Sequence, residues 1–391
     1  MATMLTSIGE YERRISKVRS AMEAQGIDTV LLSVGHDLPY LTGYTAMPLE
    51  RLTMLALHRG GTPLLFVPRL EAPRIAEMPG LFEIVPWDET VEPLDLVAAA
   101  CSGSSTIAIG DQTWARFLVG LSHRLPGVRW ERAVDVVGDL RMRKSSAEVE
   151  ALRAAAEAVD AIAAELQSGH IPLIGRTEAE VSADLSQRIL ARGHQKVNFA
   201  IVAAGENAAS PHHHPGSRVI QPDEVVLCDF GGTMSGYCSD ITRCVVTGEI
   251  PSEVAAAYEV LMAAQSAGVA AGQIGVRCEE VDSTTRQIIT EGGYGEYFVH
   301  RTGHGIGMEE HEDPYMVSGD VRLIEEGFAY SVEPGIYIPN KWGLRLEDIV
   351  VATAEGPLSL NQADHNLHSV SALSRCHRSQ RVFDPLRSNN P

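Results

Sequence analysis

The sequence predicts an α/β amino-terminal domain with a mixed sheet, followed by an α+β domain. Three observations support this fold class. The chain has 391 residues, 45% of them hydrophobic, which is enough for two cores rather than one. Short helix and strand patterns alternate up to about residue 140, as in small α/β domains. Beyond that point, long helical patterns and runs of antiparallel strand candidates replace the alternation, which is typical of α+β domains.

The amino-terminal domain is expected to begin with a helix. Apolar residues recur at helical spacing from Tyr11 to Met22, and Gly26 ends the helix before an apolar strand at 29–33. Further strands are predicted at 52–57, 63–67, 82–85 and 106–109, the first two joined as a hairpin by residues 59–61. No glycine-rich phosphate loop follows any of them, so a nucleotide-binding function has little support.

The second domain is expected to open with two capped helices. Ser145 with Glu148, and Thr177 with Glu180, form capping-box patterns before apolar residues at steps of three and four. Helices are also predicted at 252–270 and 279–290, and strands at 197–203, 328–332 and 344–351. The predicted boundaries are 1–143, 144–365 and a basic carboxy-terminal tail at 366–391, whose composition is compatible with disorder.

Composition excludes several classes of function. A net charge of −19 would repel phosphate backbones and anionic lipids, so we expect no nucleic-acid partner and no membrane partner. The first residues lack the pattern of a signal peptide, and no apolar run approaches the ~18 residues of a membrane span. The six cysteines show no CxxC spacing, which argues against a thiolate metal site and a disulfide framework. A cytoplasmic location fits best.

Residues 225–243 carry two aspartates in a predicted β-hairpin. Asp229 lies in the first apolar run, Asp240 lies in the second, and a glycine-rich turn separates the runs. Like charges on neighbouring strands repel, so the pair fits either a bound cation or a shared proton.

A glycine-dense segment further along the chain carries His300 and His304. Glycines on both sides of His304 let the backbone bend tightly and approach another group. The two histidines are not a zincin HExxH pair, because position 301 is Arg and the interleaved glycines would weaken a helix. A structural role is the alternative for each histidine.

Two glutamates complete the set of candidate ligands. Glu333 ends an apolar strand, where Pro334 and Gly335 force a turn. Glu347 lies in the middle of the predicted strand 344–351, where a buried carboxylate is costly unless it is paired or bound to metal. The alternative for Glu347 is a salt bridge, with Arg345 as an obvious partner.

The order and context of these residues resemble the metallopeptidase family of Xaa-Pro aminopeptidases, prolidases and methionine aminopeptidases, whose catalytic domain has the pita-bread fold. The matching motifs are Asp229-Phe-Gly, Ser239-Asp-Ile-Thr-Arg, Thr302-Gly-His-Gly-Ile-Gly, Ser331-Val-Glu-Pro-Gly and Leu344-Arg-Leu-Glu-Asp. The segment Asp37-Leu-Pro-Tyr-Leu-Thr-Gly-Tyr resembles a signature of the creatinase/prolidase-like amino-terminal domain. Methionine aminopeptidases lack that domain. The resemblance therefore implies such a domain at 1–143 and a pita-bread domain at 144–365.

The resemblance also implies a site with two divalent metal ions. Asp229 would bind one ion, His304 and Glu333 the other, and Asp240 and Glu347 would bridge both. Four carboxylates and one imidazole suit manganese as the first choice, with cobalt or zinc as alternatives. A metal-bridging hydroxide would attack an amide carbonyl, and Glu333 would take and return the proton.

Four further residues have roles by resemblance. His212 matches a catalytic histidine that helps to stabilise the tetrahedral intermediate, although His213 or His214 could face the site instead. His300 and His311 match positions that line the substrate pocket, with a catalytic role for His311 as well. Arg345 would hold a site carboxylate in place or approach the substrate terminus. A packed core histidine is the alternative for His300.

The implied function is hydrolysis of the Xaa-Pro bond at the amino-terminal end of dipeptides or short proline-containing peptides by a homodimeric enzyme. One alternative is a metal-dependent amidohydrolase of the same fold that cleaves a non-peptide C–N bond, as ectoine hydrolases and creatinases do. Another is a non-catalytic binding protein on the pita-bread scaffold. The presence of all five ligand-type residues speaks against the creatinase version and against the binding protein.

Overall fold

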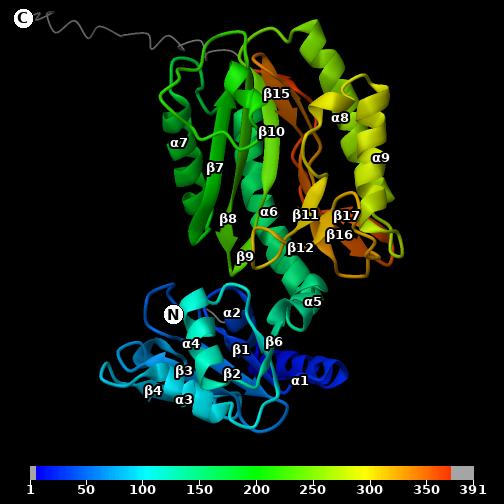
Figure 1. Ribbon diagram of the computed structural model, residues 1–391. Coiled ribbons are helices and arrows are strands. Elements are labelled where there is room, and N and C mark those ends of the chain that lie inside the picture. The colour runs from blue at the N-terminus through cyan, green and yellow to red at the C-terminus, as the bar shows by residue number, and fades with distance from the viewer. Residues whose placement is uncertain (1–5, 371–391) are drawn as a thin grey trace, which may run out of the picture.

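A six-stranded mixed sheet forms the centre of the amino-terminal domain, as the sequence predicted. The structure, a computed structural model, describes residues 6–370 (Figure 1). The strand order is β4-β3-β2-β1-β5-β6. The strands are β1 Thr29–Leu32, β2 Met54–His58, β3 Leu64–Pro68, β4 Glu83–Trp87, β5 Thr106–Ile109 and β6 Arg129–Arg132. β2 pairs antiparallel with β1 and β3, and the other neighbours pair in parallel. The sequence analysis missed β6 because its residues RWER are polar rather than apolar.

Helices cover both faces of this sheet. α1 Ile8–Gln25 and α2 Asp37–Thr42 pack in one core cluster with the sheet, and α3 Pro93–Ala100 and α4 Ala115–Arg124 pack in another. The predicted stop of α1 is confirmed. Gly26 adopts a left-handed conformation with φ of 71°, which glycine reaches without steric cost.

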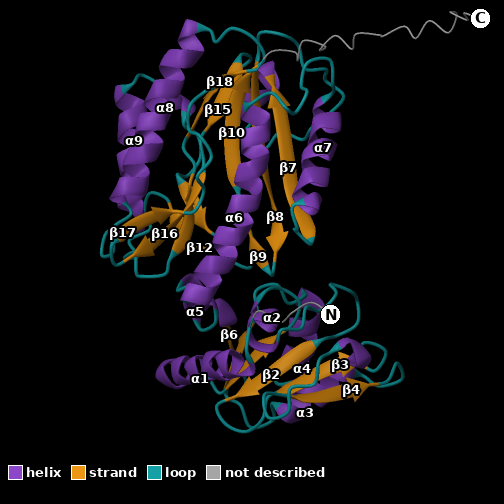
Figure 2. Cartoon of the chain, turned by 180° about the vertical axis from the view of Figure 1, so that it is seen from behind, coloured by secondary structure: helices purple, strands orange, loops and turns teal. Residues whose placement is uncertain are grey.

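The second domain holds three antiparallel-rich sheets between outer helices (Figure 2). The first sheet has the order β18-β10-β8-β7, with β9 on β8. The second has the order β12-β11-β13-β16-β17, and β14 pairs with β15. These strands are β7 Lys196–Ala204, β8 Val225–Met234, β9 Tyr237–Cys238, β10 Ile241–Val246, β11 Gly303–Gly305, β12 Glu312–Met316, β13 Ala329–Val332, β14 Gly335–Ile338, β15 Trp342–Arg345, β16 Asp348–Thr353, β17 Gly356–Ser359 and β18 His368–Ser369.

Two pairs of helices enclose the sheets. α6 Ser146–Gln167 and α7 Glu178–Ala191 pack on the first sheet, whereas α8 Ser252–Ala271 and α9 Cys278–Glu291 lie on the opposite side of the domain (Figure 1). The capping boxes predicted for α6 and α7 are both formed. Fold class and element order therefore agree with the predicted α/β and α+β domains.

α8 is the one described helix that is long and apolar enough, by length and composition, to cross a membrane. Its mean hydropathy is 1.3 over the best window. The helix contains no long unbroken apolar run, and its alanines raise the mean hydropathy between polar residues. Val254, Leu261 and Ala264 are buried in the core cluster that includes β8 and β10, and core helices of this length can be equally apolar. This is therefore weak evidence for a membrane span.

Two expectations need correction near the carboxy-terminal end. The predicted strand 344–351 is two strands, β15 and β16, and Glu347 lies between them instead of in mid-strand. β15 pairs with β14, whereas β16 pairs with β13, so the pairing partner changes at this point. Between the two strands, Glu347 forms an isolated antiparallel bridge with Thr242 of β10. In addition, β18 pairs with β10, so the sheet continues past residue 365 (Figure 2). Residues 371–391 of the expected tail lie outside the described residues.

Buried charges connect the two domains. We define the interdomain cluster as Arg141, Lys144, Asp37, Glu309 and Glu312. Arg141 Nη1 lies 2.6 Å from Asp37 Oδ1 and 3.0 Å from Glu309 Oε1. Arg141 Nη2 also donates to Glu312, whose other oxygen lies 2.5 Å from Lys144 Nζ. Since Asp37 belongs to α2, this cluster holds the amino-terminal domain against the loop that carries Glu309.

A second link passes through Glu148 at the start of α6. One oxygen of Glu148 accepts from Ser145 N at 2.8 Å and completes the capping box. The other accepts from the Tyr237 hydroxyl at 2.8 Å and lies 3.3 Å from Arg14 Nη2 of α1. Tyr237 belongs to β9 at the tip of the hairpin, so α1, α6 and the hairpin meet at one buried carboxylate.

Candidate metal centre

The β8–β10 hairpin places its two aspartates on one face of the sheet. Asp229 of β8 lies opposite Thr242 of β10 in the strand register. Asp240 lies two residues before Thr242, so both side chains point to the same face. Position 231, directly after Asp229-Phe, requires glycine, because a Cβ there would lie 2.0 Å from the Ser239 carbonyl oxygen. The predicted hairpin is thus formed with the two carboxylates side by side.

His304 enters the same space from β11. Its backbone N–H donates to Ser331 Oγ at 3.0 Å, and its Nδ1 lies 3.1 Å from the Gly305 carbonyl oxygen. Gly303 permits this approach, because a Cβ there would lie 1.8 Å from the Ser331 carbonyl oxygen. A donor Nδ1 leaves Nε2 free for a ligand. Nε2 lies 3.2 Å from Glu333 Oε1 and 3.8 Å from Asp240 Oδ2.

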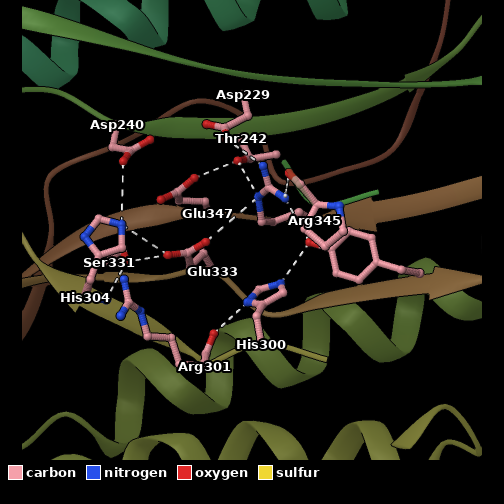
Figure 3. A network of polar contacts seen from close by, with 12 residues as sticks. Asp229, Asp240, Thr242, His300, Arg301, His304, Ser331, Glu333, Arg345 and Glu347 are labelled. Carbon is pink, nitrogen blue, oxygen red and sulfur yellow. Dashed lines mark hydrogen bonds and ion pairs between the residues drawn. The ribbon is translucent and has the colours of Figure 1, made fainter. Parts of the chain in front are cut away.

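Glu333 and Glu347 face each other across the cavity. Glu333 follows β13 and accepts from Ser331 Oγ at 3.0 Å. Glu347 accepts from Thr242 Oγ1 at 2.6 Å. Asp240, His304 and Glu347 offer ligand atoms that all lie within 4.8 Å of one another, as a metal ion would require. Figure 3 shows these side chains converging from both sheets.

Arg345 is a buried cation that holds part of this acidic group. Its Nη2 lies 2.6 Å from Asp229 Oδ2, and its Nε donates to Thr242 Oγ1 at 3.0 Å. Nε also lies 3.9 Å from Glu333 Oε2. Of the two roles considered for Arg345, the geometry favours fixing a site carboxylate. The ion pairs of residues 6–370 include none between Arg345 and Glu347, which was the alternative for that glutamate.

The unpaired oxygens of the aspartates test whether cations fit here. Asp229 Oδ1 and Asp240 Oδ1 are buried without a hydrogen-bond partner in the described part of the chain. Burial and the charges of Glu347, Asp229 and Glu333 raise the pKa of Asp240 well above its ordinary value. Burial and the charges of Glu333 and Asp229 do the same to the pKa of Glu347. Orphaned acceptors with raised pKa values are what a carboxylate cage shows when it depends on divalent ions. The donor set fits.

Glu333 behaves differently from the other carboxylates. Burial acts to raise its pKa, but the hydrogen bond and charge of His304, with His300 and Arg345, lower the pKa to about 2. Glu333 is therefore ionised at neutral pH, whereas Asp240 and Glu347 resist ionisation together.

The flanking histidines line the cavity with different partners. His212 faces the cavity, whereas His213 Nε2 lies 2.8 Å from Glu178 Oε2, so His212 is the one that the structure brings to the site. His300 Nε2 lies 2.9 Å from the Tyr337 hydroxyl. The ring centroid of His311 lies 3.9 Å from that of His304. Burial, with the charges of His304 and Arg301, lowers the pKa of His311 to about 4, so this imidazole is neutral at pH 7.

One cavity of about 570 Å³ is lined by the five candidate ligands and by four further candidate site residues, but not by His213 or His214. These are Asp229, Asp240, His304, Glu333, Glu347, His212, His300, His311 and Arg345. The sequence analysis gave no weight to Thr242, although it lies in a quoted motif, because a hydroxyl carries no metal-ligand signal. Tyr337 was missed altogether, yet it contacts both His300 and Arg345 at 2.9 and 2.8 Å.

Comparisons with known proteins agree with this geometry. Residues 149–354 match the description "Metallopeptidase family M24", and residues 14–143 match "Creatinase/Prolidase N-terminal domain". The "Probable dipeptidase PepE" of Mycobacterium tuberculosis (strain ATCC 25618 / H37Rv) is 40% identical over 91% of this chain and 96% of its own length. The "Xaa-Pro dipeptidase" of Lactobacillus delbrueckii subsp. lactis is 34% identical over 88% and 95%.

Solved structures show the same relationship. Dipeptidase PepE from Mycobacterium ulcerans has a TM-score of 0.86 at 39% identity, with 94% of this chain and 99% of that chain covered. Recombinant prolidase from Thermococcus sibiricus has a TM-score of 0.87 at 34% identity, with 92% and 99% covered. With nearly the whole chain matched and a cage of carboxylates and histidine in place, this chain belongs to metallopeptidase family M24 and carries a creatinase/prolidase amino-terminal domain.

Proposed function

We propose that this protein is a dinuclear-metal peptidase that hydrolyses the Xaa-Pro bond at the amino-terminal end of dipeptides or short peptides. The observation that carries the proposal is the cavity in which four carboxylates and His304 converge with orphaned aspartate oxygens. The relatives named dipeptidase, Xaa-Pro dipeptidase and prolidase support the substrate class.

In this proposal the chain holds two ions with its own oxygens and one nitrogen. Asp229, Asp240, His304, Glu333 and Glu347 would hold the ions, Asp229 on the side of Arg345 and Glu333 on the side of His304. Manganese is our first choice, with cobalt or zinc as alternatives, since carboxylate-rich sets suit such ions. When bound, the ions supply Lewis acidity that activates a water for attack on an amide carbonyl.

The protein side chains supply positioning and proton transfer. Glu333 lines the cavity beside His304, so its carboxylate can accept a proton from the attacking water and return it to the leaving nitrogen. His212 lines the cavity and can donate a hydrogen bond to the carbonyl oxygen as negative charge develops there. His311 is neutral at pH 7, so it can contact the substrate without adding charge. Tyr337 holds His300 at the wall.

The test uses full-length protein that is stripped of metal and reloaded with manganese. We expect release of the first residue from Xaa-Pro dipeptides, little release from matched Xaa-Ala dipeptides, and about two ions per chain by elemental analysis. A panel of non-peptide amides serves as the comparison. Hydrolysis of those amides in preference to Xaa-Pro substrates, or no hydrolysis by protein that holds its metal, would contradict the proposal.

A further inference from the structure

Arg301 is a cation at the wall of the cavity that is not engaged with a carboxylate. Two arginines line the cavity, and Arg345 is paired with Asp229. The ion pairs of residues 6–370 include none that involves Arg301. Its Nη2 lies 3.4 Å from His311 Nδ1, so its polar contact there is with an imidazole and not with a carboxylate. The guanidinium therefore keeps hydrogen-bond donors and a full positive charge for something that enters the cavity.

The Arg301 side chain is held in place by an aromatic platform. Its guanidinium carbon lies 4.4 Å from the centroid of the Tyr315 ring. Tyr315 of β12 is the cross-strand partner of His304 in β11. Directly opposed residues of an antiparallel pair point to the same face. Arg301 is therefore stacked on the sheet face that carries His304, and the cation–π contact limits its motion.

The position of Arg301 fits one end of a very short substrate. His311 separates Arg301 from His304, with contacts of 3.4 Å on one side and 3.9 Å between ring centroids on the other. One peptide residue spans at most ~3.6 Å, so the carboxylate of a dipeptide lies close to its scissile bond. Arg301 is separated from the proposed ligand His304 only by the His311 ring, so its guanidinium is within reach of that carboxylate.

Charge at the wall makes the choice of ligand specific. Glu310 also lines the cavity, and its Oε1 lies 3.9 Å from Lys196 Nζ, so Arg301 is the wall cation left to offset the charge of a substrate carboxylate. The planar guanidinium offers two parallel donors that match a carboxylate and gain little from a neutral amide. A dipeptide carries a carboxylate at this position, whereas a longer peptide carries an amide.

We propose that Arg301 binds the carboxylate of a dipeptide substrate and thereby makes this protein a dipeptidase rather than an aminopeptidase. This rests on the proposed function, because it assumes a peptide whose scissile bond lies at the metal centre. Arg301 acts as a specificity residue, and the reaction at the metal centre does not require it.

The experiment compares one Xaa-Pro dipeptide as the free acid and as its carboxamide. For the wild type, we expect kcat/KM to favour the acid by roughly 10- to 100-fold, the range of a hydrogen bond to a charged group. Arg301→Gln should lose most of that preference because kcat/KM falls for the acid, whereas kcat/KM for the amide should change by less than about threefold. Arg301→Lys, which keeps the charge without the planar fork, should be intermediate. Arg129→Gln, at an exposed position of β6, is the control with unchanged preference.

Equal losses on acid and amide would overturn the proposal, because they would mean that Arg301 acts only through its contact with His311. A wild type without preference for the acid would overturn it as well. Binding of a non-hydrolysable reduced-bond Xaa-Pro analogue, as acid and amide, is measured by calorimetry for the same variants. If the wild type hydrolyses neither substrate yet binds the acid analogue in an Arg301-dependent way, the proposed function fails while the carboxylate site stands. If the acid analogue binds equally to wild type and Arg301→Gln, the carboxylate site fails.

Discussion

The metal cavity and the interdomain cluster are both groups of buried carboxylates, yet they are neutralised in different ways. In the interdomain cluster, Arg141 and Lys144 meet all three acids directly. Burial acts to raise the pKa of Glu312, but the charges of Lys144 and Arg141 outweigh it, so the pKa is lowered. Asp37 is the exception, because burial dominates and raises its pKa.

In the metal cavity, the chain supplies too few cations. Arg345 contacts Asp229 and approaches Glu333, which leaves Asp240 and Glu347 with raised pKa values. The comparison shows that acidic residues alone do not indicate a metal site. A deficit of protein cations around buried acids is the stronger indication, because such a group must either take up protons, as the raised pKa values allow, or be completed by a cation from solution.

The largest expected effect comes from Asp240→Asn in the metal cavity. Removing one proposed bridging carboxylate should lower kcat/KM by roughly 10²- to 10³-fold, because several kcal/mol of metal-dependent charge stabilisation are lost. Metal content should fall in parallel. Without metal, the variant should unfold no more easily than wild type, since the buried Asp240 carboxyl, which has a raised pKa and an oxygen without a hydrogen-bond partner, has gone. Full activity with a full complement of metal would show that Asp240 is not a ligand.

A change in the interdomain cluster should act on stability instead. Arg141→Met keeps the apolar stem but leaves Asp37, Glu309 and Glu312 short of a cation, which should cost about 3 kcal/mol of unfolding free energy. The measurement is urea unfolding at pH 7. The matched control is Arg143→Met, because Arg143 is 36% exposed, pairs with exposed Glu325, and should cost less than about 1 kcal/mol. Equal costs for the two variants would remove the distinction between a buried and a surface network.

The smallest expected effect is a pH dependence that belongs to Glu312. Its pKa in the folded protein lies below the ordinary glutamate pKa of 4.5, so its contribution to stability is present above pH 4.5 and is lost as pH falls through the folded pKa. The difference in unfolding free energy between wild type and Glu312→Gln should therefore be largest near neutral pH and shrink in acid. A difference independent of pH would mean that packing, not charge, accounts for it.

Local sequence patterns were sufficient for several elements, whereas roles for His212, His311 and Arg345 came only from the family resemblance. Capping boxes, the stop at Gly26 and the hairpin at Asp229 and Asp240 depend on neighbours in the chain, and all are formed as predicted. Glycine-dense motifs located His304 because its β11 backbone packs against β13 too closely for a side chain at Gly303.

What the sequence did not show depends on pairing between distant segments. Arg141 meets partners 104 and 171 residues away, and no local pattern marks that choice. The interruption between strands β15 and β16 at Glu347 depends on contact with Thr242 in another sheet. An apolar run was therefore mistaken for one continuous strand. Tyr337 was missed for the same reason, because its hydroxyl is directed by His300 and Arg345.

The carboxylate of Glu148 has a consequence for the construction of chimaeras. It completes the cap of α6, receives the Tyr237 hydroxyl from the hairpin tip, and meets Arg14 from α1. A chimaera that joins a relative's amino-terminal domain at residue 143 must therefore bring an arginine that reaches this carboxylate. Without one, the graft would bury a charge beside the strand that leads to Asp240, and domain exchange would disturb the catalytic half although no site residue had been altered.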